Sequence, residues 1–269
     1  MHDRRLNDIS EFWSVADALA DAARAETLTH FRAIGLTAES KRSDFDPVTI
    51  ADRASEAAMR RILADRRPND GILGEEEAPT IGTSGLTWVL DPIDGTRGYI
   101  SGTPTWGVLI ALADEKGPLL GVVDQPYIGE RFYGGPGRAE MAGPLGTRPL
   151  AVRQTATLSE STLFTTFPEV GTPAEGAAFR RVADKVRLTR YGCDCYAYAL
   201  LAAGQIDLVI EAGLNPYDIQ APIALIEAAG GIVTDWEGGP AHNGGRALAA
   251  ATPALHEAAL ALLAQQDGL

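Results

Sequence analysis

The residues with the clearest chemical potential lie in the run Asp-Pro-Ile-Asp-Gly-Thr, which follows the apolar residues 88–90. A strand that ends here delivers the carboxylates of Asp91 and Asp94 into a turn. Gly95 permits a tight backbone and the close approach of a ligand. Thr96 is a good helix N-cap, which predicts a helix N-terminus that faces an anion. Carboxylates beside a phosphate cradle suit Mg²⁺ chemistry on a phosphate ester, although the same residues also form ordinary turns.

Three further acidic residues stand in short motifs elsewhere in the chain. Glu75 follows an apolar pair, Asp52 lies on a predicted helix, and Asp218 starts another helix after Asn215-Pro-Tyr. Oxygen ligands without cysteine or histidine select Mg²⁺, Mn²⁺ or Ca²⁺ over zinc. Each residue also has an ordinary structural interpretation: Glu75 as a solvated loop acid, Asp52 as a surface acid, and Asp218 as a plain N-cap.

Taken in order, these motifs resemble those of the inositol monophosphatase superfamily of Mg²⁺-dependent, lithium-sensitive phosphatases. The matching blocks extend from about Lys41 to Asp235, which is most of the chain. Within the superfamily the sequence is most similar to the histidinol-phosphate phosphatase branch, which acts in histidine biosynthesis. The stretches that carry this similarity are 97–107, 191–198, 206–218 and 235–238.

The resemblance implies a set of metal ligands. Glu75, Asp91 and the carbonyl of Ile93 would hold one ion, and Asp91, Asp94 and Asp218 would hold a second. The implied cofactor is Mg²⁺, as two or three ions, with Mn²⁺ as a substitute.

The resemblance also implies catalytic roles. Thr96 and Asp52 match the pair that, with Glu75, positions the water that attacks phosphorus in line. The amides of Gly95 and Thr96 are expected to bind phosphate at a helix N-terminus. Lys41 matches a lysine near the site, and it is equally well interpreted as a solvated lysine.

Three residues of the second half are candidates for substrate binding: Asp194, Glu211 and Asn215. Histidinol phosphate carries an amine and an imidazole, and carboxylates around the leaving group favour such a ligand electrostatically. A neutral polyol would prefer hydrogen-bonding groups alone. Glu211 does not discriminate, because the inositol-type branch has a glutamate here too. Asp194 discriminates better, but it is also interpretable as a helix N-cap.

The sequence therefore predicts a metal-dependent phosphomonoesterase that hydrolyses L-histidinol phosphate through activated water. The alternatives within this class are inositol-1-phosphate and sugar or nucleotide bisphosphate phosphatases, which share the superfamily fold. The alternative from another class is a metal- or phosphate-binding regulatory protein without turnover. Since every expected ligand is present, we favour the enzyme.

The composition limits the classes of molecule that the protein is expected to bind. The 269 residues carry a formal net charge of −13, which argues against a nucleic-acid or anionic-membrane surface. No run approaches the roughly 18 apolar residues of a membrane span, and the N-terminal residues lack the apolar core of a signal peptide. We expect a cytoplasmic protein with a small phosphate ester as its partner, and the resemblance implies a homodimer. Cys193 and Cys195 are expected to be reduced.

The patterning predicts an α/β protein of two lobes, 1–145 and 146–269, in a layered sandwich of the inositol monophosphatase and fructose-1,6-bisphosphatase type. An α+β first lobe is expected to contain an antiparallel meander, with its boundary in the Gly- and Pro-rich segment 134–149. Alternation of strands and helices predicts an α/β second lobe, with Pro222 in the first turn of a helix. The expected helices are 10–33, 50–65, 173–185, 194–203, 218–229 and 253–265. The expected strands are 71–73, 88–90, 108–113, 119–125, 130–133, 161–165, 187–190, 206–211 and 231–235.

Overall fold

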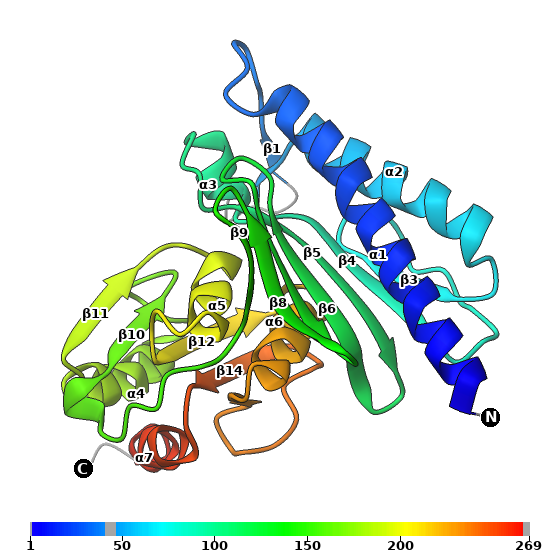
Figure 1. The fold of residues 1–269 in the computed structure, drawn as a ribbon. Helices are drawn as coiled ribbons and strands as arrows, with labels where there is room; N and C mark the ends of the chain where they lie inside the picture. The colour runs from blue at the N-terminus through cyan, green and yellow to red at the C-terminus, as the bar shows by residue number, and fades with distance from the viewer. Residues whose placement is uncertain (1, 41–46, 266–269) are drawn as a thin grey trace.

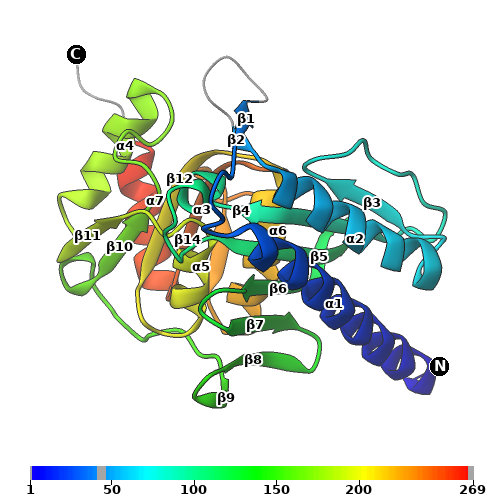
Figure 2. The same ribbon diagram turned by 90° about the horizontal axis from the view of Figure 1, so that it is seen from above.

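Helices and sheets alternate in layers across the molecule, as Figures 1 and 2 show in two views of the computed structural model. The structure describes residues 2–40 and 47–265. The α/β class expected from the sequence is confirmed. No helix within the described ranges is long and apolar enough to cross a membrane.

The larger sheet has seven strands in the order β3-β4-β5-β6-β7-β8-β9. β3 and β4 run parallel, so the expected all-antiparallel meander is wrong for this pair, whereas all later neighbours are antiparallel. The strands are β3 (Gly71–Gly74), β4 (Thr87–Asp94), β5 (Gly107–Asp114), β6 (Gly117–Gln125), β7 (Glu130–Gly135), β8 (Arg138–Gly143) and β9 (Gly146–Pro149).

Both faces of the central strands of this sheet are buried, which explains why these strands are apolar at successive positions. On β5, Val108 and Ile110 pack with the helices α1 (His2–His30) and α2 (Ile50–Arg66). Leu109 and Ala111, which alternate with them, belong to the core on the opposite side, together with α5 (Cys195–Ala202) and α6 (Pro216–Ala228).

Two glycines allow α6 to approach the larger sheet closely. A Cβ atom at Gly121 would collide with the backbone of Ala221, and one at Gly134 would collide with the backbone of Leu225. Larger residues at these positions would push the helix away from the sheet. The contact therefore sets the position of α6, and with it the position of Asp218 in its first turn.

The smaller sheet has five strands in the order β11-β10-β12-β14-β13. One face packs on α5 and α6, and the other packs on α4 and α7, which form the outer layer. β10 is parallel to β11 and β12, whereas β14 is antiparallel to β12 and β13. The elements are β10 (Thr162–Thr165), α4 (Pro173–Ala183), β11 (Leu188–Tyr191), β12 (Leu208–Leu214), β13 (Ile232–Thr234), β14 (Gly245–Ala250) and α7 (Pro253–Leu263), after the 3₁₀ helix η1 (Leu158–Glu160). A separate two-stranded sheet pairs β1 (Glu39–Ser40) with β2 (Pro47–Val48).

Three local expectations are wrong. Residues 134–149, expected to be an irregular lobe boundary, contribute β8 and β9 to the larger sheet, so the boundary expected after residue 145 falls in their hairpin. β14 was not expected, because its alanine-rich sequence lacks β-branched residues. Pro222 lies inside α6 and not in its first turn, since the helix already begins at Pro216. The division into two lobes stays a prediction.

Candidate active site

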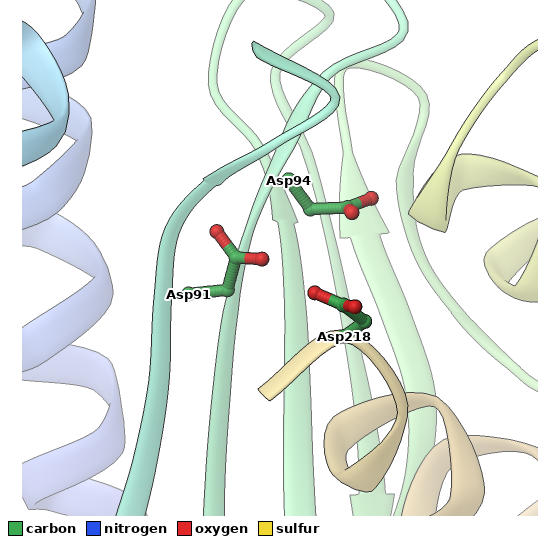
Figure 3. Close-up of side chains that lie close together, drawn as sticks. All are labelled: Asp91, Asp94 and Asp218. Carbon is green, nitrogen blue, oxygen red and sulfur yellow. The ribbon is translucent and has the colours of Figure 1, made fainter. Parts of the chain in front are cut away.

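Three aspartates bring their carboxylates together where β4 ends and α6 begins (Figure 3). One oxygen of each of Asp91, Asp94 and Asp218 lies within 4.8 Å of the corresponding oxygens of the other two. Carboxylates offer only oxygen acceptors, which suit a hard divalent cation. The structure thus brings together the ligands expected for the second metal ion.

A bulge in β4 places Asp91 and Asp94 on the same side of the sheet. Residues three apart face opposite sides of a regular strand. Asp91 pairs with Leu109 and Asp94 pairs with Gly107, so β4 has one residue more than β5 over this interval. The extra residue shifts the alternation and re-aims the second carboxylate.

Asp218 is the third residue of α6 and not its N-cap, which corrects the expected start of this helix. Asn215 takes the N-cap position, and its backbone N–H donates to Asp218 Oδ2 at 2.6 Å. Pro216 follows as the first helical residue, where its missing N–H costs nothing. The helix start thereby orients the carboxylate towards the two aspartates of β4, as Figure 3 shows.

Burial and like charge make this cluster electrostatically unfavourable on its own. Asp91 is 2% exposed, and its pKa is raised well above its ordinary value, first by burial and then by the charges of Glu75, Asp94 and Asp218. The pKa of Asp94 is raised by burial and by the charges of Asp194 and Asp218, although the N–H of Cys195 donates to it at 2.5 Å. A bound cation would remove this repulsion.

Asp52 and Thr96 lie together beneath the turn, as the resemblance implied. Asp52 is 1% exposed, so its interpretation as a surface acid is wrong. Its Oδ2 accepts hydrogen bonds from the N–H and hydroxyl of Thr49 at 2.8 and 2.7 Å. The Thr96 hydroxyl lies 3.1 Å from the carbonyl oxygen of Ile93 and 3.4 Å from Asp52 Oδ1. Because one hydroxyl has one proton, the two acceptors share it.

Gly95 is required by the conformation of the turn. It has φ +84° and takes the N-cap position of α3 (Thr96–Ile100), so Thr96 is the first helical residue and not the expected N-cap. A Cβ at Gly95 would lie 2.8 Å from Asp194 Oδ2. Gly95 therefore allows both the left-handed backbone and the close approach of Asp194, the N-cap residue of α5.

A pocket of about 260 Å³ lies beside the aspartate cluster, and most of the predicted site residues line it. Asp91, Asp52 and Ile93 are not part of its lining, and the last two accept hydrogen bonds from the Thr96 hydroxyl. Lys41 lies outside the described residues. The predicted site residues that line the pocket are Glu75, Asp94, Gly95, Thr96, Asp194, Glu211, Asn215 and Asp218.

The two acids expected to select the substrate are held differently. Asp194 is at the N-cap position of α5, but its side chain makes no capping hydrogen bond, so the N-cap interpretation does not describe that carboxylate. Burial raises its pKa to about 6, against the opposing charge of Arg97. Glu211 is buried, and its Oε1 accepts from the N–H and hydroxyl of Thr166 at 2.8 and 2.9 Å. Burial raises its pKa to about 7 despite these bonds.

Sequence reasoning missed several residues that shape the site. Buried Glu56 accepts from the N–H groups of Glu76 and Glu77 at 2.7 and 3.0 Å, and so holds the turn that carries Glu75. Phe167 and Arg97 line the pocket. A signal was available for Phe167, since it follows a strand of a parallel pair, whose carboxyl end commonly faces a ligand.

Comparisons with known proteins agree with this arrangement. The model of the "Inositol monophosphatase family" matches residues 8–267. The chain is 37% identical over 239 residues to the histidinol-phosphatase of Mycobacterium tuberculosis, covering 87% of this chain and 91% of that protein. It is 43% identical over 233 residues to the bifunctional phosphatase IMPL2, chloroplastic, of Arabidopsis thaliana, covering 86% of this chain but 66% of that protein's own length. A solved inositol monophosphatase from Zymomonas mobilis matches with a TM-score of 0.81 at 37% identity, covering 93% of this chain and 96% of that one. The layered fold implied by the resemblance is confirmed.

Proposed function

The chain belongs to the inositol monophosphatase family, and we propose that it is a Mg²⁺-dependent phosphomonoesterase that hydrolyses L-histidinol phosphate to L-histidinol and phosphate. The observation that carries the reaction type is the convergence of Asp91, Asp94 and Asp218 within 4.8 Å beside a pocket. The substrate assignment is supported by the similarity to histidinol-phosphatases and by the acids that line the same pocket.

The residues of the cluster fit a divalent cation. Two of the three aspartates have raised pKa values, which reflect the cost of holding like charges together away from water. The donor set contains oxygen and no sulfur or imidazole, which favours Mg²⁺ or Mn²⁺ over zinc. Bound ions would stabilise the charge on the transferring phosphoryl group and on the leaving alkoxide.

The protein's own groups would position the water and the phosphate. The Thr96 proton is engaged by Ile93 and Asp52, so its oxygen accepts a hydrogen bond from the attacking water. Glu75 lines the pocket nearby, and its carboxylate would accept the proton that this water releases. The amides of Gly95 and Thr96 would donate to the phosphate oxygens. The reaction needs no covalent enzyme intermediate.

The leaving group would lie against Asp194, Glu211 and Asn215, which line the pocket. Of the two carboxylates there, Asp194 is the one that favours a cationic amine or imidazole over a neutral polyol, because Glu211 does not discriminate between the two branches. The second candidate substrate is inositol-1-phosphate, which is supported by the similarity to the inositol monophosphatase from Zymomonas mobilis. On the family resemblance alone, we further propose a homodimer, which sedimentation of the purified protein would test.

A phosphate-release panel tests the proposal. The purified protein is given histidinol phosphate, inositol-1-phosphate, fructose-1,6-bisphosphate and adenosine 3′,5′-bisphosphate, each with Mg²⁺ and with a chelator. We expect metal-dependent release that is fastest, by kcat/KM, with histidinol phosphate. Preference for inositol-1-phosphate would reject the substrate and keep the reaction type, whereas release that persists with the chelator would reject the metal-dependent mechanism.

A further inference from the structure

Phe167 is an aromatic residue that stays exposed at the pocket. It follows β10 and retains 45% of its surface, although it is a large apolar side chain. Among the described residues that line the pocket, it is the one aromatic side chain. Its neighbours there are mainly acids, glycines and small polar groups, so it gives the pocket an apolar surface that phosphate chemistry does not require.

The surrounding contacts hold Phe167 in place. The preceding residue, Thr166, donates from its N–H and its hydroxyl to Glu211 Oε1 at 2.8 and 2.9 Å. The following residue, Pro168, restricts Phe167 to extended backbone. The guanidinium carbon of Arg97 lies 5.0 Å from the centre of the Phe167 ring. A site whose parts are held in advance loses little entropy when a ligand binds.

We propose that Phe167 is a specificity-determining residue that recognises a planar ring in the leaving group, which for histidinol phosphate is the imidazole. This inference rests on the proposed function and deepens it. Arg97 lies over the ring, yet nearly half of the residue remains exposed, which leaves aromatic surface for a ligand. Aromatic pairs gain from stacked or edge-to-face contact beyond the burial of surface.

The carboxylates and the aromatic ring of the pocket would recognise different parts of the substrate. Asp194 and Glu211 line the same pocket and can attract a cationic amine. A carboxylate attracts any cation, whereas an aromatic face adds preference for a flat partner. Loss of Phe167 should therefore affect substrates with a ring and spare substrates that carry only an amine. If Phe167 instead serves only to brace Arg97, its loss should affect all substrates alike.

The test compares two phosphate esters that share an amine and differ in the ring: histidinol phosphate and O-phosphoethanolamine. The variants are Phe167→Ala, Phe167→Leu and Phe167→Trp. The control is Tyr191→Ala, which removes an aromatic residue of similar exposure, 49%, on β11 outside the pocket lining. For Phe167→Ala we expect kcat/KM for histidinol phosphate to fall about tenfold, mainly through KM, the equivalent of about 1.4 kcal/mol.

Phe167→Leu keeps bulk without an aromatic face and should lose nearly as much, whereas Phe167→Trp should restore most of the activity. O-phosphoethanolamine should be hydrolysed by every variant as by the unmutated enzyme, and Tyr191→Ala should change neither substrate. Equal losses for the two substrates in Phe167→Ala, or full activity of Phe167→Leu, would overturn the inference and leave the proposed function intact. An unmutated enzyme without preference for histidinol phosphate would overturn the proposed function, and the inference with it.

Discussion

Asp91 and Asp94 face the same side of the larger sheet because a bulge inserts one residue between them. Opposite them, β5 advances by only the two positions from Leu109 to Gly107. Without the bulge the second carboxylate would point to the other face, away from Asp218. The three-carboxylate cluster of Figure 3 therefore depends on a local irregularity of one strand.

Asp94→Asn is expected to abolish Mg²⁺-dependent turnover while leaving the protein folded. The amide removes one of the three negative charges of the cluster, so a cation loses a ligand and the metal-free protein loses repulsion. Turnover with Mg²⁺ and thermal unfolding without metal measure the two effects, and the melting temperature should be unchanged or higher. Asp114→Asn, at the end of β5 outside the cluster, serves as the control. Near-normal turnover in folded Asp94→Asn would contradict the metal assignment.

Mg²⁺ is expected to stabilise the folded protein in the absence of substrate. Binding to the folded state alone adds about 2.7 kcal/mol when the free ion is at about a hundred times its Kd. Thermal unfolding at rising Mg²⁺, after treatment with a chelator, measures the shift. Asp94→Asn should show little of it, because its site lacks a carboxylate. An equal shift in both proteins would mean that Mg²⁺ stabilises the chain somewhere other than the aspartate cluster.

Gly95→Ala is expected to destabilise the fold by about 1–3 kcal/mol, because alanine must adopt a left-handed backbone there. Its φ is +84°, and a Cβ would also lie 2.8 Å from the Asp194 carboxylate. Urea unfolding measures the change. Gly137→Ala is the matched control, since Gly137 has φ +76° and a Cβ added there would meet nothing within 4 Å. If both variants lose the same stability, the contact with Asp194 contributes nothing.

Glu211 should make the metal-free protein less stable as the pH rises. Its pKa is raised from an ordinary 4.5 to about 7 by burial, so the folded state resists ionisation. The stability associated with its neutral form is present below pH 4.5 and is lost as the pH rises through about 7. The loss is on the order of 3 kcal/mol. Urea unfolding at pH 5 and pH 8 should show a smaller decrease for Glu211→Gln than for the unmutated protein.

The matched control for Glu211 is Glu237→Gln, because Glu237 is an exposed glutamate away from the pocket. Its pH profile should follow that of the unmutated protein. Identical profiles for all three proteins would show that Glu211 ionises as freely in the folded state as in the unfolded one.

Asp194→Asn is expected to lower kcat/KM for histidinol phosphate by roughly 10–100-fold, because a charge-assisted hydrogen bond of about 1.5–3 kcal/mol is lost. The side chain makes no capping bond in α5, so the helix start should tolerate the change. Steady-state kinetics with histidinol phosphate and with a small neutral phosphate ester measure the difference. The neutral ester should be hydrolysed nearly as before. Equal losses for both esters would make Asp194 a support of the metal site.

The sequence by itself determined the order of most helices and strands, and it singled out the three aspartates that we propose as metal ligands. Apolar runs and helical periodicity are local patterns, so α2, β5 and α4 begin within a residue of their expected positions. The two carboxylates of the Asp-Pro-Ile-Asp-Gly-Thr run can be recognised from the sequence without any knowledge of the fold. Capping residues and glycines also indicated where turns occur, although Gly95 and Asn215 take the N-cap positions that were expected at Thr96 and Asp218.

Only the tertiary structure decided how these pieces meet, because strand pairing and burial depend on residues far apart in the chain. The parallel pairing of β3 with β4 arises from partners that no local pattern specifies. Residues 134–149 differ, because they join the larger sheet through hairpins of neighbouring residues, which the sequence analysis interpreted as an irregular boundary. Likewise, Asp52 is buried because of the residues packed around it, although aspartate is usually a surface residue. Phe167 enters the pocket because β10 lies beside β12, where Glu211 can hold the adjoining residue through hydrogen bonds. A side chain's chemistry is visible in the sequence, but its neighbours across the fold decide whether that chemistry is used.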